Sequence, residues 1–190
     1  MPFFEPYHQL LNDLEGLCEA LSTKHAAHLS CQAGCSGCCL PGLGVFQVEA
    51  DALKTALKAL APEQQAQVLA QARQALAAPE AQTHCALLLN DLCTVYAQRP
   101  VICRTHGLPV YFQDEEAAAE GEVLLDVCPL NFTEPGALEA LELPDTLALD
   151  RLNLRLAAIN HVYCRDQLQD LGLAQERVGL AELALETLEN

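Results

Sequence analysis

Four cysteines lie within nine residues, in the segment Cys31-Gln-Ala-Gly-Cys35-Ser-Gly-Cys38-Cys39. Cysteine adds little apolar volume to a core, so packing alone does not account for this density of thiols. Thiolates are soft ligands that suit zinc, iron and iron–sulfur clusters, and Gly34 and Gly37 allow the backbone to turn tightly between them. The segment therefore predicts a metal centre.

Further cysteines recur later in the chain, in segments that we expect to lie outside the helices. Together with the first segment they make eight candidate metal ligands: Cys31, Cys35, Cys38, Cys39, Cys85, Cys93, Cys103 and Cys128. The remaining two, Cys18 and Cys164, fall inside predicted helices. Cys18 lies near the apolar stripe of its helix, where a free cysteine behaves as a small hydrophobe. We therefore leave both out of the ligand set.

The number of thiolates bears on the metal. Four of them hold one iron–sulfur cluster, whereas one or two zinc ions would each take four ligands in a tetrahedron. Eight thiolates are more than one structural zinc needs, and Cys128-Pro129 matches the Cys-Pro that closes iron–sulfur loops in ferredoxins. We favour an iron–sulfur cluster over zinc, and the sequence leaves open whether Cys38 or Cys39 is the ligand.

Basic side chains near Cys103 are candidates for contact with the metal centre. The chain has only ten Lys and Arg residues, and two of them, Arg99 and Arg104, flank this cysteine. Their positive charge would stabilise thiolates or an anionic cluster. The alternative is that they pair with surface carboxylates. His106 is a third candidate, as a ligand or proton carrier rather than an ordinary loop residue.

The spacing Cys-x3-Cys-x2-Cys has a second interpretation. It also occurs where three thiolates hold a four-iron cluster whose open iron binds S-adenosylmethionine. Enzymes of that kind place the motif in a barrel of alternating strands and helices. A chain of 190 residues with few predicted strands does not supply a full barrel, so we disfavour this interpretation.

Composition and charge narrow the class of protein. The chain is 51% apolar and 19% charged, which is typical of a globular protein, and we expect a single domain over residues 1–190. The net charge of −16 disfavours nucleic acid as a partner. Neither a signal peptide nor a run of 18 apolar residues is evident, so we expect no membrane association. Clustered cysteines then indicate a cytoplasmic metal or redox protein.

Apolar spacing and turn residues predict the elements that position these cysteines. Helices are expected over 6–28, 49–60, 63–78, from an N-cap at Asp145 to 163, and over 174–188. Hairpins are expected over 85–96, with its turn at Asn90-Asp91, and between 108–112 and 123–127, around an exposed, mobile tip at 114–122. The predicted fold is mainly α: a small helical domain enclosing a cysteine-rich metal core of loops and short β-hairpins.

These motifs resemble those of a known family, the YkgJ-type cysteine-cluster or CxxCxxCC proteins. The resemblance rests on the first cysteine segment, on a second block that runs from Cys85 to Cys93 and then Val95-Tyr96-x2-Arg99-Pro100-x2-Cys103-Arg104, and on Cys128-Pro-Leu-Asn131. It covers about residues 28–131 and implies a zinc- or iron-chelating module, flanked here by N- and C-terminal helices. Some relatives are flagellin lysine N-methylases, which implies S-adenosylmethionine as cofactor and a lysine-bearing protein as partner.

Three functions follow, in order of preference. The first is a cytoplasmic metal-binding protein with a thiolate-held iron–sulfur cluster. The second is a protein-lysine methyltransferase-like enzyme using the cluster and S-adenosylmethionine, although the chain has no Gly-x-Gly-x-x-Gly motif after a strand. The third is a zinc-stabilised interaction module whose acidic helical surface recruits a protein partner.

Overall fold

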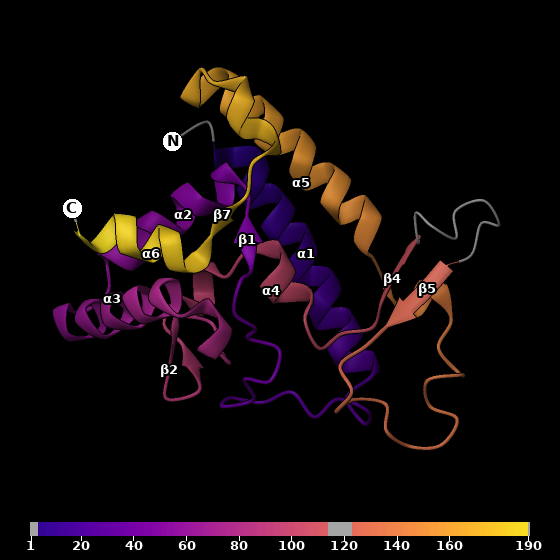
Figure 1. Ribbon diagram of the computed structural model, residues 1–190. Helices are drawn as coiled ribbons and strands as arrows, with labels where there is room; N and C mark the ends of the chain where they lie inside the picture. Colours follow the sequence, from indigo (N-terminus) through magenta and orange to yellow (C-terminus); the bar gives the residue numbers. More distant parts are fainter. Residues whose placement is uncertain (1–3, 114–122, 190) are drawn as a thin grey trace. The chain divides into compact units, whose positions relative to one another are not determined.

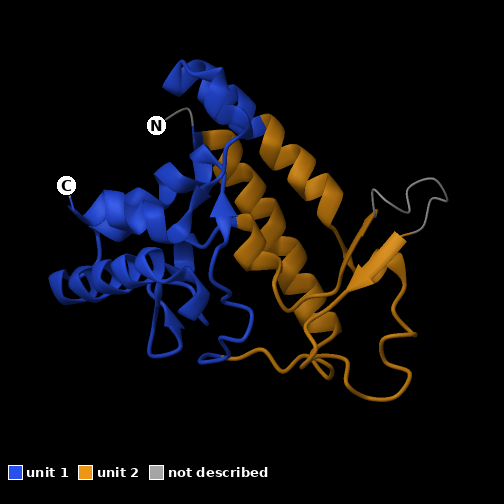
Figure 2. Ribbon diagram, viewed as in Figure 1, with its two compact units in different colours: residues 1–4, 33–100, 159–190 blue, residues 5–32, 101–158 orange. Residues whose placement is uncertain are grey.

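Helices dominate the structure, a computed structural model that describes residues 4–113 and 123–189 (Figure 1). Six α-helices and seven short strands occur within these residues, so the prediction of a mainly α fold is confirmed. The chain divides into two compact units (Figure 2). Unit 1 comprises residue 4 and residues 33–100 and 159–189, and unit 2 comprises residues 5–32 and 101–158 apart from 114–122. The single domain over 1–190 stays a prediction.

Unit 1 has a core formed by three helices, α2 (Gln47–Lys58), α3 (Pro62–Ala77) and α6 (Leu180–Glu189). Their buried positions recur at helical spacing, and Pro62 starts α3, where its missing N–H costs no hydrogen bond. Strands β1 (Gly44–Val45) and β7 (Val178–Gly179) pair antiparallel beside these helices. The core comprises Val45, Ala50, Leu53, Leu57, Val68, Ala72, Ala86, Leu87, Val95, Leu180, Leu183 and Ala184.

The hairpin expected over 85–96 is present in unit 1. Its strands are β2 (Leu88–Leu89) and β3 (Leu92–Cys93), and Leu88 faces Cys93 across the ladder. Asn90 and Asp91 have φ of 50° and 60°, the left-handed pair that a tight two-residue hairpin turn requires. The turn residues therefore fix the register that places Cys93.

Asn160 organises a fully buried polar site in unit 1. Its Oδ1 accepts a hydrogen bond from the Val48 N–H at the start of α2, over 3.1 Å, and its Nδ2 donates to the Ala174 carbonyl over 3.0 Å. The Cys164 thiol lies 3.7 Å from the same Oδ1. Asn160 thereby satisfies one of the N–H groups that a helix start leaves without a partner inside the helix.

Unit 2 is built on α1 (Glu5–Lys24), whose buried stripe includes Leu10, Leu14 and Leu21 as the leucine spacing predicts. It also contains α4 (Val101–Thr105) and residues 149–158 of α5 (Leu149–Tyr163). Strand β4 (Val110–Gln113) pairs antiparallel with β5 (Val123–Asp126), as expected, and parallel with β6 (Leu147–Ala148).

Shorter helical segments connect these elements. The 3₁₀ helices are η2 (Pro79–Ala81), η3 (Tyr96–Gln98), η4 (Leu143–Asp145) and η6 (Leu171–Gln175), and a π-helical segment, η5, spans Cys164–Leu168.

Three local predictions are wrong. Cys103 lies in α4 rather than outside the helices, because a five-residue helix after Pro100 is too short to show a periodic pattern. Asp145 ends η4 and does not cap α5, because residues 147–148 first pair with β4. The last helix begins at Leu180, after η6 and β7, rather than at Ala174. The expected tip at 114–122 lies outside the described residues.

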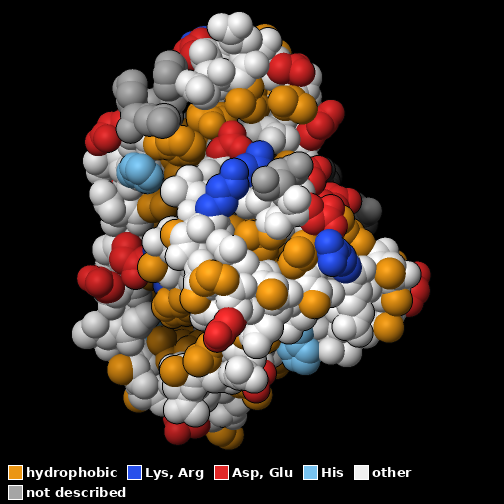
Figure 3. All heavy atoms as spheres, turned by 90° about the vertical axis from the view of Figure 1, so that its left-hand side faces the viewer, with side chains coloured by type: hydrophobic (Ala, Val, Ile, Leu, Met, Phe, Trp, Pro, Cys, Tyr) orange, Lys and Arg blue, Asp and Glu red, His pale blue; other side chains and the backbone are white. Residues whose placement is uncertain are grey.

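Acidic side chains are spread over the face seen in Figure 3, whereas basic side chains occur on it in a few places. This pattern agrees with the net charge of −16. In the part of the chain that the structure describes, no helix combines the length and the apolar character needed to cross a bilayer.

Candidate metal centre

Five of the eight predicted ligands lie in unit 1. They are Cys35, Cys38 and Cys39 in the glycine-containing loop before β1, Cys85 just before the hairpin, and Cys93 in β3. A backbone hydrogen bond from the Cys85 N–H to the Cys39 carbonyl, 2.8 Å long, ties the loop to the approach of the hairpin. Segments separated by more than 40 residues therefore bring these cysteines into one neighbourhood.

The thiols of this group act on one another electrostatically. Burial raises the pKa of Cys39, the charges of Cys93 and Cys35 raise it further, and a hydrogen bond with Cys38 partly opposes them. Burial also raises the pKa of Cys85 to about 11; a backbone hydrogen bond near Leu87 opposes this rise, and the charges of Cys93 and Cys39 add to it. The thiolates of Cys93 and Cys39 thus disfavour ionisation of Cys85, and a cation near these sulfurs would favour their ionised forms.

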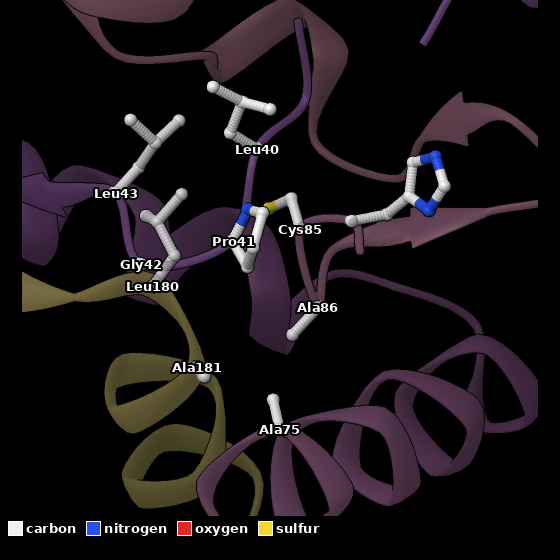
Figure 4. A pocket seen from close by; sticks show the side chains of 10 residues that line it. Leu40, Pro41, Gly42, Leu43, Ala75, Cys85, Ala86, Leu180 and Ala181 are labelled. Carbon is white, nitrogen blue, oxygen red and sulfur yellow. The ribbon is translucent and has the colours of Figure 1, made fainter. Parts of the chain in front are cut away.

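Cys85 has an apolar and a polar side. On the apolar side it lines a cavity of about 20 Å³ together with Leu40, Pro41 and Leu180 (Figure 4). On the polar side it lines an open groove of about 350 Å³, whose other walls include Gln74. The apolar side explains the burial that keeps this thiol protonated.

Arg99 provides positive charge next to the hairpin. Its guanidinium lies 4.0 Å from the centroid of the exposed Tyr96 ring, and its Nη1 donates to the Tyr96 carbonyl over 3.2 Å. Burial raises the pKa of Cys93, while a backbone hydrogen bond near Val95 and the charge of Arg99 lower it. Arg99 thus favours the Cys93 thiolate, in the direction that the sequence predicts.

The other three predicted ligands belong to unit 2. Cys31 follows the turn after α1, Cys103 lies in α4, and Cys128 follows β5. Cys31 is exposed, and Cys103 and Cys128 are half-buried. Unit 2 therefore contributes three thiols from three separate segments.

Asn131 contacts the sulfur of Cys31, and sequence reasoning did not predict this contact. Its Nδ2 lies 3.4 Å from the Cys31 Sγ and 2.6 Å from the Gly107 carbonyl, and its Oδ1 accepts from the Ser30 N–H over 2.8 Å. The signals in the sequence were an asparagine three residues after Cys128 and a glycine directly after His106. Neither signal identifies Cys31 as the partner.

The remaining basic candidates also lie in unit 2. Arg104 donates from Nη1 to the Glu15 carboxylate over 2.5 Å, and its side chain is only 9% exposed. His106 is half-buried; burial lowers its pKa, and the charge of Asp126 opposes this shift. A neutral imidazole is the form that binds metal, so His106 keeps its place among the candidates.

Cys18 and Cys164 are buried, as expected for core residues. Cys18 is 7% exposed and lies 3.6 Å from the Arg104 carbonyl, whereas Cys164 is fully buried and packs against Asn160. The predicted core position of Cys18 is confirmed, and the structure places Cys164 in the core as well.

The donor set fits a thiophilic metal. None of the ten cysteines, all of which lie among the described residues, is in a disulfide, and five of the predicted ligands lie in unit 1. Gly34, directly before Cys35, has a left-handed backbone conformation (φ 88°). Within residues 4–113 and 123–189, no three Cys, His, Asp or Glu side chains already stand as a closed metal site.

Comparison with known proteins decides the family. A family model described as "CxxCxxCC: Putative zinc- or iron-chelating domain" matches residues 30–129. The chain belongs to the CxxCxxCC family. The matched range contains all eight predicted ligands, from Cys31 to Cys128. Membership confirms the predicted family, and the family's description supports a zinc- or iron-chelating domain. No curated protein and no solved structure matches the chain.

Proposed function

We propose that this CxxCxxCC protein holds a metal centre through cysteine thiolates, and that unit 1 supplies a complete set of four. The observation that carries the proposal is the electrostatic effect of Cys93 on Cys39, and of Cys93 and Cys39 on Cys85. These three cysteines come from the first cysteine loop and both sides of the hairpin. Cys35 or Cys38 supplies the fourth thiolate, since both act on Cys39. Four thiolates satisfy either tetrahedral zinc or an iron–sulfur cluster.

We favour the iron–sulfur cluster. A net negative cluster gains from the charge of Arg99 beside Cys93, and Cys128-Pro129 matches the Cys-Pro of iron–sulfur loops. Such a cluster supplies one-electron transfer when bound, and hydrogen bonds and nearby charge tune its potential. Free thiols require a reducing compartment, so we place the protein in the cytoplasm.

We also propose Cys31, Cys103 and Cys128 of unit 2 as metal ligands, with Arg99, Arg104 and His106 as residues that would contact a bound metal group. Their support is their place in the family motif and the matched range. Because unit 1 alone holds enough thiolates for one centre, loss of a unit 2 cysteine should lower metal content less than loss of Cys85 does.

Purification under anaerobic conditions tests the proposal. We expect a coloured protein with iron and inorganic sulfide in equal amounts and the Mössbauer spectrum of a cluster. Cys85→Ser and Cys93→Ser should lower the iron content, whereas Cys18→Ser and Cys164→Ser, made at buried cysteines outside the set, should keep it. Colourless protein with stoichiometric zinc would overturn the iron assignment, and equal losses in all four variants would overturn the ligand set.

The two other functions predict different results. A lysine-modifying enzyme would bind S-adenosylmethionine in its metal-loaded form, which calorimetry measures directly. A zinc-stabilised interaction module would unfold when chelators remove the metal and would show no redox cycle. A cluster that cycles between oxidation states without binding S-adenosylmethionine would remove both alternatives.

A further inference from the structure

The buried side-chain amide of Asn131 contacts the sulfur of the exposed Cys31. Asn131 is only 3% exposed, although it lies in a loop. The oxygen of its side-chain amide accepts a hydrogen bond, and the nitrogen donates one. Its Oδ1 faces the Ser30 N–H and its Nδ2 faces the Gly107 carbonyl, so these two partners determine which end of the amide is the donor. The second Nδ2 hydrogen is then available to the Cys31 Sγ at 3.4 Å.

The backbone at Gly107 packs directly against the same sulfur. Gly107 has φ of 92°, and a Cβ at this position would lie 2.6 Å from the Cys31 Sγ. No side chain larger than hydrogen fits there unless the sulfur moves. Asn131 and Gly107 together therefore determine where the Cys31 sulfur sits relative to its own loop.

Linking the two loops does not by itself require an N–H group pointed at sulfur. The Ser30 hydroxyl already donates to the Leu130 carbonyl over 2.9 Å and so joins the same two segments. An N–H donor stabilises a thiolate, and partners that orient metal ligands in this way are typically worth 10- to 100-fold in metal affinity. The contact of Asn131 with Cys31 is of that kind.

We propose that Asn131 is a positioning residue for the metal ligand Cys31: its amide holds the Cys31 thiolate in place by an N–H···S hydrogen bond, while Gly107 leaves room for the sulfur. The inference rests on the proposed role of Cys31 as a ligand. Beyond that role, it assigns a hydrogen-bond donor to the Cys31 sulfur, Asn131, and a position beside the sulfur that must stay glycine, Gly107.

Cobalt binding tests the role of Asn131. Metal-free full-length protein is loaded with Co²⁺ under reducing, anaerobic conditions, and its release to a chelator is followed through the sulfur-to-cobalt charge-transfer band. Asn131→Ala should release Co²⁺ about 10- to 100-fold faster than the parent protein. Ser30→Ala, which removes the neighbouring loop hydrogen bond without touching sulfur, should stay within about threefold. In a Cys31→Ser background, Asn131→Ala should have no further effect.

A second pair of variants tests the steric requirement and does not depend on Asn131. Gly107→Ala should accelerate Co²⁺ release, because its Cβ displaces the Cys31 sulfur. Gly136→Ala is the matched control, since Gly136 has a similar φ of 82° but no atom within 4 Å of a built Cβ. Gly136→Ala imposes comparable backbone strain without a contact between the new Cβ and the Cys31 sulfur. The difference in Co²⁺ release rate between the two variants therefore measures the effect of that contact alone.

The results separate failure of this inference from failure of the proposed ligand role. If Cys31→Ser leaves the charge-transfer band and the release rate unchanged, Cys31 is not a ligand. Its ligand role and the positioning role of Asn131 then both fall, whereas the four thiolates proposed in unit 1 stand. If Cys31→Ser weakens binding but Asn131→Ala behaves like Ser30→Ala, only the positioning role falls. Additive effects of Asn131→Ala and Cys31→Ser would also overturn it, because a general structural role does not act through the sulfur.

Discussion

Metal binding to unit 1 should release protons, and the number released follows from the thiols described above. The pKa values of Cys39, Cys85 and Cys93 are all raised, so these groups carry protons at pH 7. A metal binds the thiolate, and each of the three must lose its proton when the metal enters. We therefore expect Zn²⁺ binding to the metal-free protein at pH 7 to release at least three protons.

Among these three thiols, the free energy needed for ionisation at pH 7 is largest for Cys85. With its pKa at about 11, ionising this thiol at pH 7 costs about 5 kcal/mol, which the metal–sulfur bond must supply. Raising the pH lowers the free energy needed to ionise the Cys85 thiol. Metal affinity therefore rises with pH until the pH reaches the pKa of this thiol. The apparent association constant should increase about tenfold per pH unit for each proton displaced, or about a thousandfold for three.

Isothermal titration calorimetry in two buffers with different ionisation enthalpies measures the proton count directly. Cys164→Ser provides a matched control, because burial also raises the pKa of Cys164 but the thiol lies outside the proposed ligand set. It should leave the proton count and the affinity unchanged, while Cys85→Ser should lower the affinity at least about tenfold. Release of two protons or fewer, or an equal effect of Cys164→Ser, would refute the reasoning.

Three further predictions concern the scaffold of unit 1. Asn160→Ala leaves two buried backbone groups without partners and should lower the free energy of unfolding by about 2–4 kcal/mol in urea denaturation, whereas exposed Asn153→Ala on the same helix should change it by less than about 0.5 kcal/mol. Leu183→Ala removes a fully buried side chain and should cost about 2–5 kcal/mol by the same assay; a loss below about 1 kcal/mol would contradict the described core. Asn90→Val places a β-branched residue at φ 50° and should weaken Zn²⁺ binding, while Asn90→Gly should preserve it; equal affinities would show that the hairpin turn does not position Cys93.

Local rules account for the parts of the fold that the sequence predicts. The leucine spacing of α1, Pro62 at the start of α3 and the Asn90-Asp91 turn each act through residues a few positions apart. The density of cysteines likewise indicated metal chemistry without any knowledge of the fold. These features depend on residues that are close together in the sequence, so they can be predicted from one sequence without knowledge of the fold.

Features that depend on distant partners could not be predicted in this way. Strand β6 is two residues long and exists because β4 provides its ladder, and α4 is too short to show a helical period. The contact between Asn131 and Cys31 joins residues 100 positions apart, and nothing local to either residue implies it. The basic candidates show the same limit, since the pairing of Arg104 with Glu15 depends on α1 lying against α4.

X-ray absorption at the metal edge of the anaerobically purified protein tests the central claim most directly, because it reports the atoms bound to the metal. The account predicts a first shell of sulfur alone, at about 2.3 Å if the metal is zinc, with an added iron–iron distance if it is a cluster. A first shell dominated by nitrogen or oxygen, or protein without stoichiometric metal, would contradict a thiolate-held centre.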